Sequence, residues 1–353
     1  MVAVSPTGSG KSLVFYLLFR YFNSKTIFIV PTIGLVNQMS EDFHSYGYGE
    51  EIHGVTAGVE KDTDALLTIT TYQSVVRQPM SWFAQFVVSM TDEAHVDKTK
   101  SLRTIFDKMP SIGIRIGMTG TLSEHVLDKM KVIGILGPSI QFTTTKKLID
   151  KGYLSEIFVN SLILVHEGNV HWNLSDRTYS FEYPDEIEFL MNSHKRLDFI
   201  RRLSISLKGN TLVMFKRIDY GEKLFQVIKE STDKLIFYVD GKTEIENREE
   251  TRKSINESEN SLTICSTVFS TGININRLNN IILAQPVKSK IPILQTIGRG
   301  TRLHENKNGC AIYDIGDKIY SDFDNITYRH SQERLRIYKS EKFPIKENRI
   351  VLK

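Results

Sequence analysis

The chain has 353 residues, of which 41% are hydrophobic and 24% are charged, and its formal net charge at pH 7 is +4. This composition is ordinary for a globular protein, and no apolar run approaches the roughly 18 residues that cross a bilayer, which excludes a membrane-spanning chain. The length exceeds that of one ordinary core, so the sequence predicts two domains of about 150 residues each.

Short apolar runs alternate with amphipathic stretches in the first half of the chain. This alternation is typical of parallel strands joined by crossover helices, so residues 1–150 are expected to form one α/β domain. The five strands of its sheet are expected at Val2 to Val4, Thr26 to Val30, Leu66 to Thr70, Phe86 to Met90 and Ile114 to Met118. The join with the second domain is expected around Lys146 to Ser155, where charge clusters replace strand residues.

A phosphate-binding loop is expected after the first strand, in the stretch Ser5-Pro6-Thr7-Gly8-Ser9-Gly10-Lys11-Ser12. A helix from Leu13 to Phe22 is predicted to follow, so backbone N–H groups and the helix N-terminus would face bound phosphates. The strict pattern has Gly at the position of Ser5, but Gly8 and Gly10 still permit the tight turn. The loop therefore predicts ATP or GTP binding, with a Gly-rich turn that binds nothing as the alternative.

Two adjacent acids, Asp92 and Glu93, follow the buried strand at residues 86–90. At the carboxyl end of a strand, Asp92 can hold the hydration shell of a magnesium ion while Glu93 orients and deprotonates the attacking water. A solvated strand end is the alternative interpretation. His95 is expected to link the acid pair to the other lobe by a hydrogen bond, because no second His or Cys stands at metal-ligand spacing. Trp82, in the apolar stretch before the strand, is expected to pack in the core.

The same alternation returns in the second half, so residues 151–330 are expected to form a second α/β domain. A strand is expected at Ile157 to Val165, and apolar residues at three- and four-residue steps predict a helix from about Asp185 to Leu207. Further strands are expected at Thr211 to Phe215, Leu235 to Val239, Leu262 to Cys265, Asn280 to Ala284 and Cys310 to Tyr313.

Near the end of this domain, the stretch Gln295-Thr296-Ile297-Gly298-Arg299-Gly300-Thr301-Arg302 places two arginines three residues apart. Residues at that spacing share one face of a helix. A guanidinium is planar, always charged and bidentate, which suits it to phosphate. Together with the phosphate loop, this pattern predicts one ATP site built from both ends of the chain, with a surface ion-pair cluster as the alternative.

The C-terminal stretch is basic. Residues 329–353 hold eight Lys or Arg against three Glu, a local charge of 8 − 3 = +5. Residues 331–353 are therefore expected to be a basic C-terminal tail or helix. Such a segment either attracts a polyanion through phosphate contacts or is a solvated terminal helix.

The sequence favours a cytoplasmic protein. Its N-terminus shows no positively charged start followed by an apolar stretch and a cleavage site, so no secretory signal is expected. The two cysteines, Cys265 and Cys310, are too few for a disulfide framework or a four-ligand zinc site. A reducing compartment fits both observations.

Eight stretches resemble a known family. Those that resemble the ordered motifs of superfamily 2 helicases are Ser5 to Ser12, Asp92 to His95, Met118 to Thr121 and Gln295 to Arg302. Those that resemble in particular the UvsW-type recombination helicases of tailed phages are Thr71 to Val76, Trp82 to Phe86, Val268 to Ile273 and Val287 to Lys290. The resemblance spans essentially the entire chain. It implies an α/β fold of two tandem RecA-like domains with parallel sheets, an ATP cleft between them and nucleic acid across their top faces.

The resemblance also implies a role for each matching residue. The catalytic residues would be Lys11, Asp92, Glu93, Gln295, Arg299 and Arg302, and the ATP-binding residues would be Thr7, Gly8, Ser9, Gly10, Lys11, Ser12, Gly272 and Asn274. The residues that couple hydrolysis to strand movement would be His95, Thr119, Gly120 and Thr121. The residues that contact the nucleic-acid backbone would be Thr32, Thr71 and Ser266. Ser12 and Asp92 would hold Mg²⁺. Many members carry Asp at the position of Asn274, although Asn can still hydrogen-bond a ribose hydroxyl.

The predicted function is that of an ATP-dependent DNA helicase or translocase that uses ATP and Mg²⁺ and unwinds or remodels branched DNA in recombination, repair and replication. An RNA helicase is one alternative, because contacts to the backbone alone distinguish RNA from DNA poorly. A catalytically inactive nucleic-acid-binding fragment is another, because the phosphate loop starts at Ser5, where the family carries an upstream segment that helps to hold the adenine. Another polypeptide would then supply that segment. A phage-encoded protein would work in the host cytoplasm.

Overall fold

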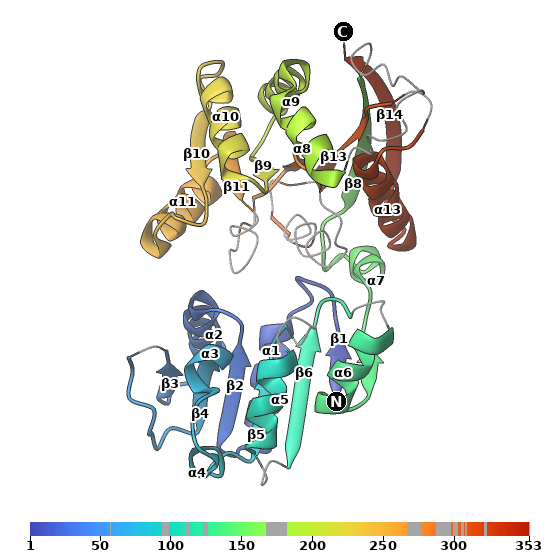
Figure 1. Ribbon diagram of the computed structural model, residues 1–353. Helices are drawn as coiled ribbons and strands as arrows, with labels where there is room; N and C mark the ends of the chain where they lie inside the picture. Colours follow the sequence, from blue (N-terminus) through green and yellow to red (C-terminus); the bar gives the residue numbers. More distant parts are fainter. Residues whose placement is uncertain are drawn as a thin grey trace. The chain divides into compact units, whose positions relative to one another are not determined.

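The computed structural model divides the chain into two compact units, Met1–Thr145 (unit 1) and Lys146–Lys353 (unit 2), each built around its own sheet (Figure 1). The residues that the structure describes are 1–56, 58–93, 99–109, 113–122, 126–166, 182–266, 275, 277–286, 298, 303–304, 307, 309–320 and 323–352. Within these ranges, no helix has the length and apolar character needed to span a membrane.

The sheet of unit 1 has seven parallel strands in the order β3-β4-β2-β5-β6-β1-β7. Its strands are β1 (Val2–Val4), β2 (Thr26–Val30), β3 (Ile52–Val55), β4 (Leu67–Thr71), β5 (Val88–Thr91), β6 (Ile114–Thr119) and β7 (Ser139–Gln141). All five predicted strands are confirmed, because buried parallel strands read as continuous apolar runs. The sequence did not predict β3 and β7, which are short, partly exposed strands at the two edges.

Helices cover both faces of this sheet. They are α1 (Lys11–Phe22), α2 (Ile33–Ser45), α3 (Tyr72–Val75), α4 (Met80–Phe83), α5 (Thr99–Asp107) and α6 (Val126–Leu136). On one face, α1 and α2 pack around Phe28, whose ring centroid lies 4.5 Å from that of Phe15 and 6.1 Å from that of Phe43. On the other face, α3 to α6 pack around Trp82, which is 7% exposed and donates from its indole N–H to the Lys61 carbonyl at 3.0 Å. The predicted core position of Trp82 is confirmed.

The sheet of unit 2 also has seven parallel strands, in the order β10-β11-β9-β12-β13-β8-β14. Its strands are β8 (Ile157–His166), β9 (Thr211–Phe215), β10 (Leu235–Val239), β11 (Ser261–Ser266), β12 (Asn280–Leu283), β13 (Cys310–Lys318) and β14 (Ile345–Leu352). The six strands predicted for this half are confirmed. Both cysteines lie in this sheet, and both are buried free thiols.

The helices of unit 2 differ from the prediction at one place. They are α7 (Thr145–Asp150, which begins at the last residue of unit 1), α8 (Tyr183–Asn192), α9 (His194–Ser206), α10 (Ile218–Lys229), α11 (Ile245–Glu257) and α13 (Ile326–Ser340). The prediction of a single helix at residues 185–207 is wrong, because the helix is interrupted at Ser193. The backbone of Ser193 is extended, and its hydroxyl accepts from the backbone N–H of Arg196 at 3.3 Å. Serine is a favoured N-cap, so it separates α8 from α9.

The basic C-terminal stretch is part of this sheet unit. Residues 331–353, expected as a basic tail or helix, contain the remainder of α13 and then β14, which pairs in parallel with β8 at the edge of the sheet. Arg334 of α13 is 1% exposed and donates to Asp314 of β13 at 2.6 Å, and the hydroxyl of Tyr338 donates to the same carboxylate at 2.7 Å. Part of the positive charge counted in this stretch is therefore buried and paired.

Candidate nucleotide-binding site

The predicted site residues of unit 1 gather along one edge of its sheet. The strands are parallel, so their carboxyl ends share one edge, and β4, β2, β5, β6 and β1 are consecutive neighbours there. The residues at or just after these ends are, in the same order, Thr71, Thr32, Asp92 with Glu93, Thr119 and Ser5. At about 4.8 Å per strand, the acid pair and the phosphate loop lie about 10 Å apart with β6 between them. This spacing leaves room for a phosphate and a hydrated metal ion.

The phosphate loop connects β1 to α1, as predicted, but α1 begins at Lys11 rather than at Leu13. Gly8 and Gly10 have φ angles of 81° and 78°, in the left-handed region that favours glycine. No side chain caps the N-terminus of α1, and its first turn contains no acidic residue. The N–H groups and the positive end of the helix dipole are therefore suited to an anion.

The serine that departs from the strict phosphate-loop pattern has a local role. Ser5 is 9% exposed, and its hydroxyl donates to the hydroxyl of Ser9 at 2.7 Å across the loop. The backbone N–H of Ser5 donates to the carbonyl of Thr119 on the neighbouring strand at 3.0 Å. A hydrogen bond thus holds together the two ends of the loop at the position where the strict pattern has glycine.

Lys11 and Ser12, the predicted phosphate and magnesium contacts, form the first turn of α1 directly after the loop. The ammonium of Lys11 donates to the carbonyls of Ser5 and Pro6 at 3.3 and 3.4 Å, which holds its charge within the loop. The hydroxyl of Ser12 shares a hydrogen bond of 2.9 Å with the hydroxyl of Tyr46, which follows α2. Sequence reasoning missed Tyr46, since it lies 34 residues from Ser12 and belongs to no motif.

The acid pair continues the ladder of β5. The backbone N–H of Asp92 donates to the carbonyl of Ile29 on β2 at 3.1 Å, and both acids are half-buried. Glu93 has φ at 52°, a left-handed conformation that costs a non-glycine residue of order 1 kcal/mol. Such strain is common at catalytic positions, where the surrounding structure fixes the direction of a side chain.

Two of the predicted coupling residues, Thr119 and Gly120, lie against the phosphate loop. Thr119 is fully buried, and its hydroxyl donates to the carbonyl of Thr121 at 3.0 Å. Gly120 lies against the loop, because a Cβ at that position would be 3.6 Å from the hydroxyl oxygen of Thr7. These contacts place residues 119 and 120 beside the loop, and their coupling role stays a prediction.

The predicted nucleic-acid contacts also have structural roles. Thr32 caps α2, with its hydroxyl accepting from the N–H of Leu35 at 3.4 Å. Thr71 caps α3 in the same way through Ser74 at 3.4 Å. Ser266 ends β11 in unit 2, and its buried hydroxyl has no hydrogen-bond partner among the residues that the structure describes. Capping explains the two threonines without a ligand, so their contact with nucleic acid stays a prediction.

Several predicted residues lie outside the described ranges: His95, Gly272, Asn274, Gln295, Arg299 and Arg302. Among the described residues, no group of three or more His, Cys, Asp or Glu could hold a metal ion by itself. Ser12 and Asp92 nevertheless suit Mg²⁺, which prefers oxygen ligands and keeps several waters and phosphate oxygens in its coordination shell.

Comparisons with known proteins agree with this arrangement. The family described as "Type III restriction enzyme, res subunit" matches residues 1–124, and the family described as "Helicase conserved C-terminal domain" matches residues 195–304. The chain is 34% identical over 365 aligned positions to the ATP-dependent DNA helicase uvsW of Enterobacteria phage T4. That alignment covers 96% of this chain and 71% of the phage protein. The chain belongs to the superfamily 2 helicases.

More distant relatives share the fold of this helicase. This chain is 22% identical to the DNA 3'-5' translocase XPB2 of Sulfurisphaera tokodaii, over 91% of this chain and 79% of that protein. The ATP-dependent Type ISP restriction-modification enzyme LlaBIII bound to DNA superposes with a TM-score of 0.70 at 14% identity, covering 99% of this chain and 30% of that one. Saccharomyces cerevisiae Dbp5, bound to RNA and ADP BeF3, superposes with a TM-score of 0.64 at 15% identity. That superposition covers 100% of this chain and 85% of Dbp5. At these identities the two structures support the tandem RecA-like fold alone.

Proposed function

We propose that this helicase couples ATP hydrolysis to movement along DNA and unwinds or remodels branched DNA in recombination, repair and replication. One observation carries the proposal: the phosphate loop, the acid pair and the coupling residues lie on adjacent strand ends of one sheet. The similarity to the DNA helicase of phage T4 supports DNA as the substrate. Such work takes place where the DNA is, which is the host cytoplasm for a phage-encoded protein.

The residues of unit 1 would carry the first part of the reaction. The N–H groups of the loop from Gly8 to Lys11 bind the phosphates, and the ammonium of Lys11 moves from the loop carbonyls to the β- and γ-phosphate oxygens. Mg²⁺, held by Ser12 and Asp92, would neutralise phosphate charge in the transition state. The carboxylate of Glu93 orients the attacking water and accepts its proton.

We extend the proposal to unit 2, whose arginine motif would complete hydrolysis. Arg299 and Arg302, with Gln295, would stabilise the charge on the transferred phosphoryl group, an effect worth about 10³ to 10⁵ in rate for an arginine. Gly272 and Asn274 would contact the ribose, and Ser266 the nucleic-acid backbone. The order of these residues in the family's motifs supports these assignments.

The substitution Glu93→Gln tests the assignment of the base. The variant should bind Mg–ATP as the unaltered protein does, because the amide keeps the shape of the carboxylate, but turnover should fall by at least about 10²-fold because the proton acceptor is lost. Glu41→Gln, on an exposed position of α2, is the matched control and should keep full activity. DNA-stimulated hydrolysis at the unaltered rate in Glu93→Gln would refute the proposed role.

The nucleic acid is tested by stimulation of ATPase activity. We expect forked DNA to stimulate hydrolysis more than single-stranded DNA, and both more than RNA of the same sequence. Equal or stronger stimulation by RNA would instead support an RNA helicase. Salt-sensitive DNA binding without measurable ATPase would instead support a nucleic-acid-binding function without catalysis.

A further inference from the structure

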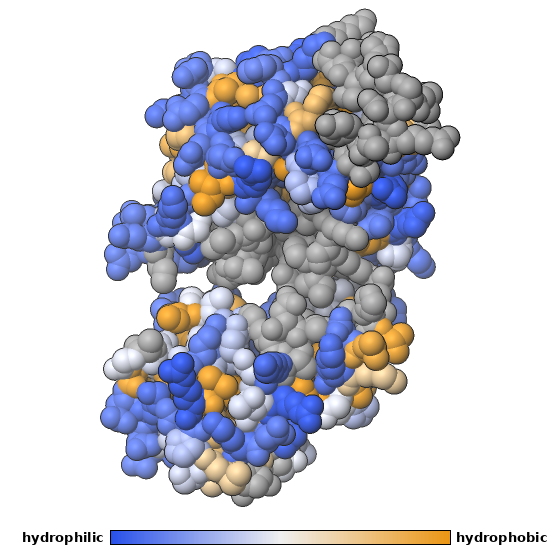
Figure 2. Space-filling view, viewed as in Figure 1, coloured by the Kyte–Doolittle hydropathy of each residue, from blue (hydrophilic) through white to orange (hydrophobic). Residues whose placement is uncertain are grey.

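One face of α13 carries positive charge into solvent. The helix buries Thr327, His330, Ser331, Arg334, Leu335 and Tyr338 within unit 2. Its opposite side exposes Arg329, Glu333, Arg336 and Lys339, and we call the three basic residues among them the α13 basic face. In Figure 2 the described atoms over this helix are mostly hydrophilic. The buried side fixes the helix in the fold, so the exposed side has a defined position.

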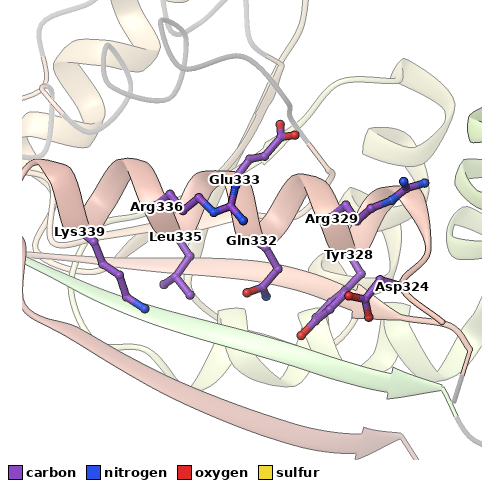
Figure 3. A pocket seen from close by; sticks show the side chains of 8 residues that line it. All are labelled: Asp324, Tyr328, Arg329, Gln332, Glu333, Leu335, Arg336 and Lys339. Carbon is purple, nitrogen blue, oxygen red and sulfur yellow. The ribbon is translucent and has the colours of Figure 1, made fainter. Parts of the chain in front are cut away.

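The basic face borders a groove that runs along the helix (Figure 3). The groove has a volume of about 560 Å³ and is lined by Asp324, Tyr328, Arg329, Gln332, Glu333, Leu335, Arg336 and Lys339. Ten residues separate Arg329 from Lys339, so the basic face is about 15 Å long at 1.5 Å per helical residue. The long polar side chains give this surface hydrogen-bond donors over its whole length.

The two arginines of the face share their helix with one nearby carboxylate, that of Glu333. Glu333 is four residues from Arg329 and three from Arg336, the spacings at which ion pairs form on helices. Neither arginine, however, forms an ion pair with any carboxylate of the described residues, and Figure 3 shows the Glu333 carboxylate directed away from the helix. Lys339 does pair, with Glu347 of β14 at 3.3 Å.

Other helices of unit 2 use their exposed arginines differently. On α9, Arg201 and Arg202 both pair with Asp198, at 2.5 and 2.9 Å. On α11, Arg252 pairs with Glu249 at 2.7 Å. Among the described residues of unit 2, the exposed arginines of α13 therefore differ from the arginines of α9, although Arg248 of α11 and the exposed Arg349 of β14 also form no ion pair.

The spacing of these charges selects the kind of anion. Arg329 and Arg336 are seven residues apart, about 10 Å along the helix, which is too far for one phosphate to meet both. A duplex carries one negative charge per 1.7 Å of its axis, so it presents phosphates along the whole face. Guanidinium groups bind phosphate in a bidentate way, and the amide of Gln332 can donate to a sugar or phosphate oxygen between them. Lys346 and Arg349 of β14 are also exposed and add positive charge near this edge of the sheet.

We propose that the α13 basic face is a second DNA contact, which binds the sugar–phosphate backbone of a duplex arm while the motor residues act elsewhere on the same molecule. The inference rests on the proposed function, because it takes DNA as the substrate of the motor. It adds a surface that none of the motor motifs contains. Contact through phosphates alone makes the binding independent of base sequence.

The full chain with the double substitution Arg329→Ala/Arg336→Ala tests the proposal. Binding to a 30-base-pair duplex and to forked DNA is measured by fluorescence anisotropy from 50 to 300 mM NaCl. Two lost phosphate contacts should reduce the slope of log K against log salt by about 2, and binding at 150 mM should weaken by about tenfold. ATPase activity without DNA should stay within about twofold of the unaltered rate, because neither residue belongs to the nucleotide site.

The matched control is Lys229→Ala/Lys253→Ala, which removes two exposed charges from α10 and α11 of the same unit. This variant should keep the salt slope of the unaltered protein. An unchanged slope in the α13 variant, or an equal loss in the control, overturns the inference while leaving the motor function intact. If the unaltered protein neither binds DNA nor shows DNA-stimulated ATPase activity, the proposed function fails and the inference fails with it.

Discussion

Single residues decide how the phosphate loop is prepared for its ligand. Ser5 stands where the strict pattern has glycine, and its bond to Ser9 ties the loop together instead. Glu93 adopts a left-handed conformation that few side chains accept. Ser12 already has a partner in Tyr46, so under the proposed function its hydroxyl would exchange that bond for one to the hydrated magnesium ion.

Tyr46→Phe tests the exchange at Ser12. Removing the phenol leaves the Ser12 hydroxyl free, so Mg–ATP should bind up to about fivefold more tightly, which corresponds to a net hydrogen bond of about 1 kcal/mol. The KM for Mg–ATP, measured across a magnesium titration, reports the change. Tyr21→Phe on α1, where the side chain is 81% exposed, is the control and should have no effect. Weaker Mg–ATP binding in Tyr46→Phe would show that the phenol assists the site.

At the scale of elements, β13 links the sheet of unit 2 to a helix on each of its two faces. Asp314 and Asp317 are three residues apart on it, so their side chains point to opposite faces of the sheet. On one face, Asp314 pairs with Arg334 of α13. On the other, Asp317 accepts two hydrogen bonds from Arg196 of α9, at 2.9 and 3.0 Å, and lies 3.0 Å from Nε2 of His166. One strand is thus fixed to a helix on each side by a buried ion pair.

This arrangement predicts a loss of stability in acid. Burial alone would raise the pKa of Asp317, but the charge of Arg196 and the bond to His166 outweigh it and lower the pKa from its usual 3.8 to about 2. The carboxylate is charged in the folded state over a wider pH range than in the unfolded chain. It therefore contributes about 2 kcal/mol of stability above pH 4, which is lost as the pH falls towards 2.

Asp317→Asn isolates this contribution. The variant leaves Arg196 buried without its counter-ion, so the free energy of unfolding at pH 7 should fall by about 3 to 5 kcal/mol. Its stability should also lose the acid dependence due to Asp317. Urea unfolding of the full chain between pH 2 and pH 7 measures both effects. Asp198→Asn, which breaks only exposed pairs on α9, should change stability by less than about 1 kcal/mol. Equal behaviour of the two variants would contradict the role of Asp317.

At the scale of the whole molecule, the proposed function divides the chemistry between the two units. Unit 1 contains the phosphate loop, the acid pair and the coupling residues. The arginine motif lies in the sequence of unit 2. Each unit has its own sheet and core, so each can keep its fold when the chemistry of the other is impaired.

Arg302→Ala tests this division. The variant should keep its affinity for Mg–ATP within about tenfold, because the phosphate loop is intact, while kcat should fall by about 10³ or more. Residues 1–145 expressed alone should likewise bind Mg–ATP and hydrolyse it at least about 10³-fold more slowly than the full chain. Arg202→Ala, which removes an exposed guanidinium from α9, is the control. Full ATPase activity in Arg302→Ala would exclude the arginine from the reaction.

Much of the fold could be predicted from local sequence, and the exceptions share a cause. Central strands such as Thr211–Phe215 are buried on both faces, so they read as apolar runs. The edge strands β3, β7 and β14 are partly exposed and lack that signal. The helix break at Ser193 could not be predicted, because α8 and α9 continue one pattern of apolar residues at helical spacing. Only the capping hydrogen bond of Ser193 separates the two helices.

The sequence by itself determined the family, the central strands and the residue types at the nucleotide site, because loops that bind phosphate and strands buried in parallel sheets need particular residues at fixed local spacing. Only the tertiary structure decided which of these residues meet. The order β2-β5-β6-β1 brings Asp92 and Thr119 beside a loop that precedes them by about a hundred residues, and it depends on long-range strand pairing. The bond between Ser12 and Tyr46 depends in the same way on contacts between elements, which no local pattern encodes, and so do the arginines of α13 that pair with no carboxylate among the described residues.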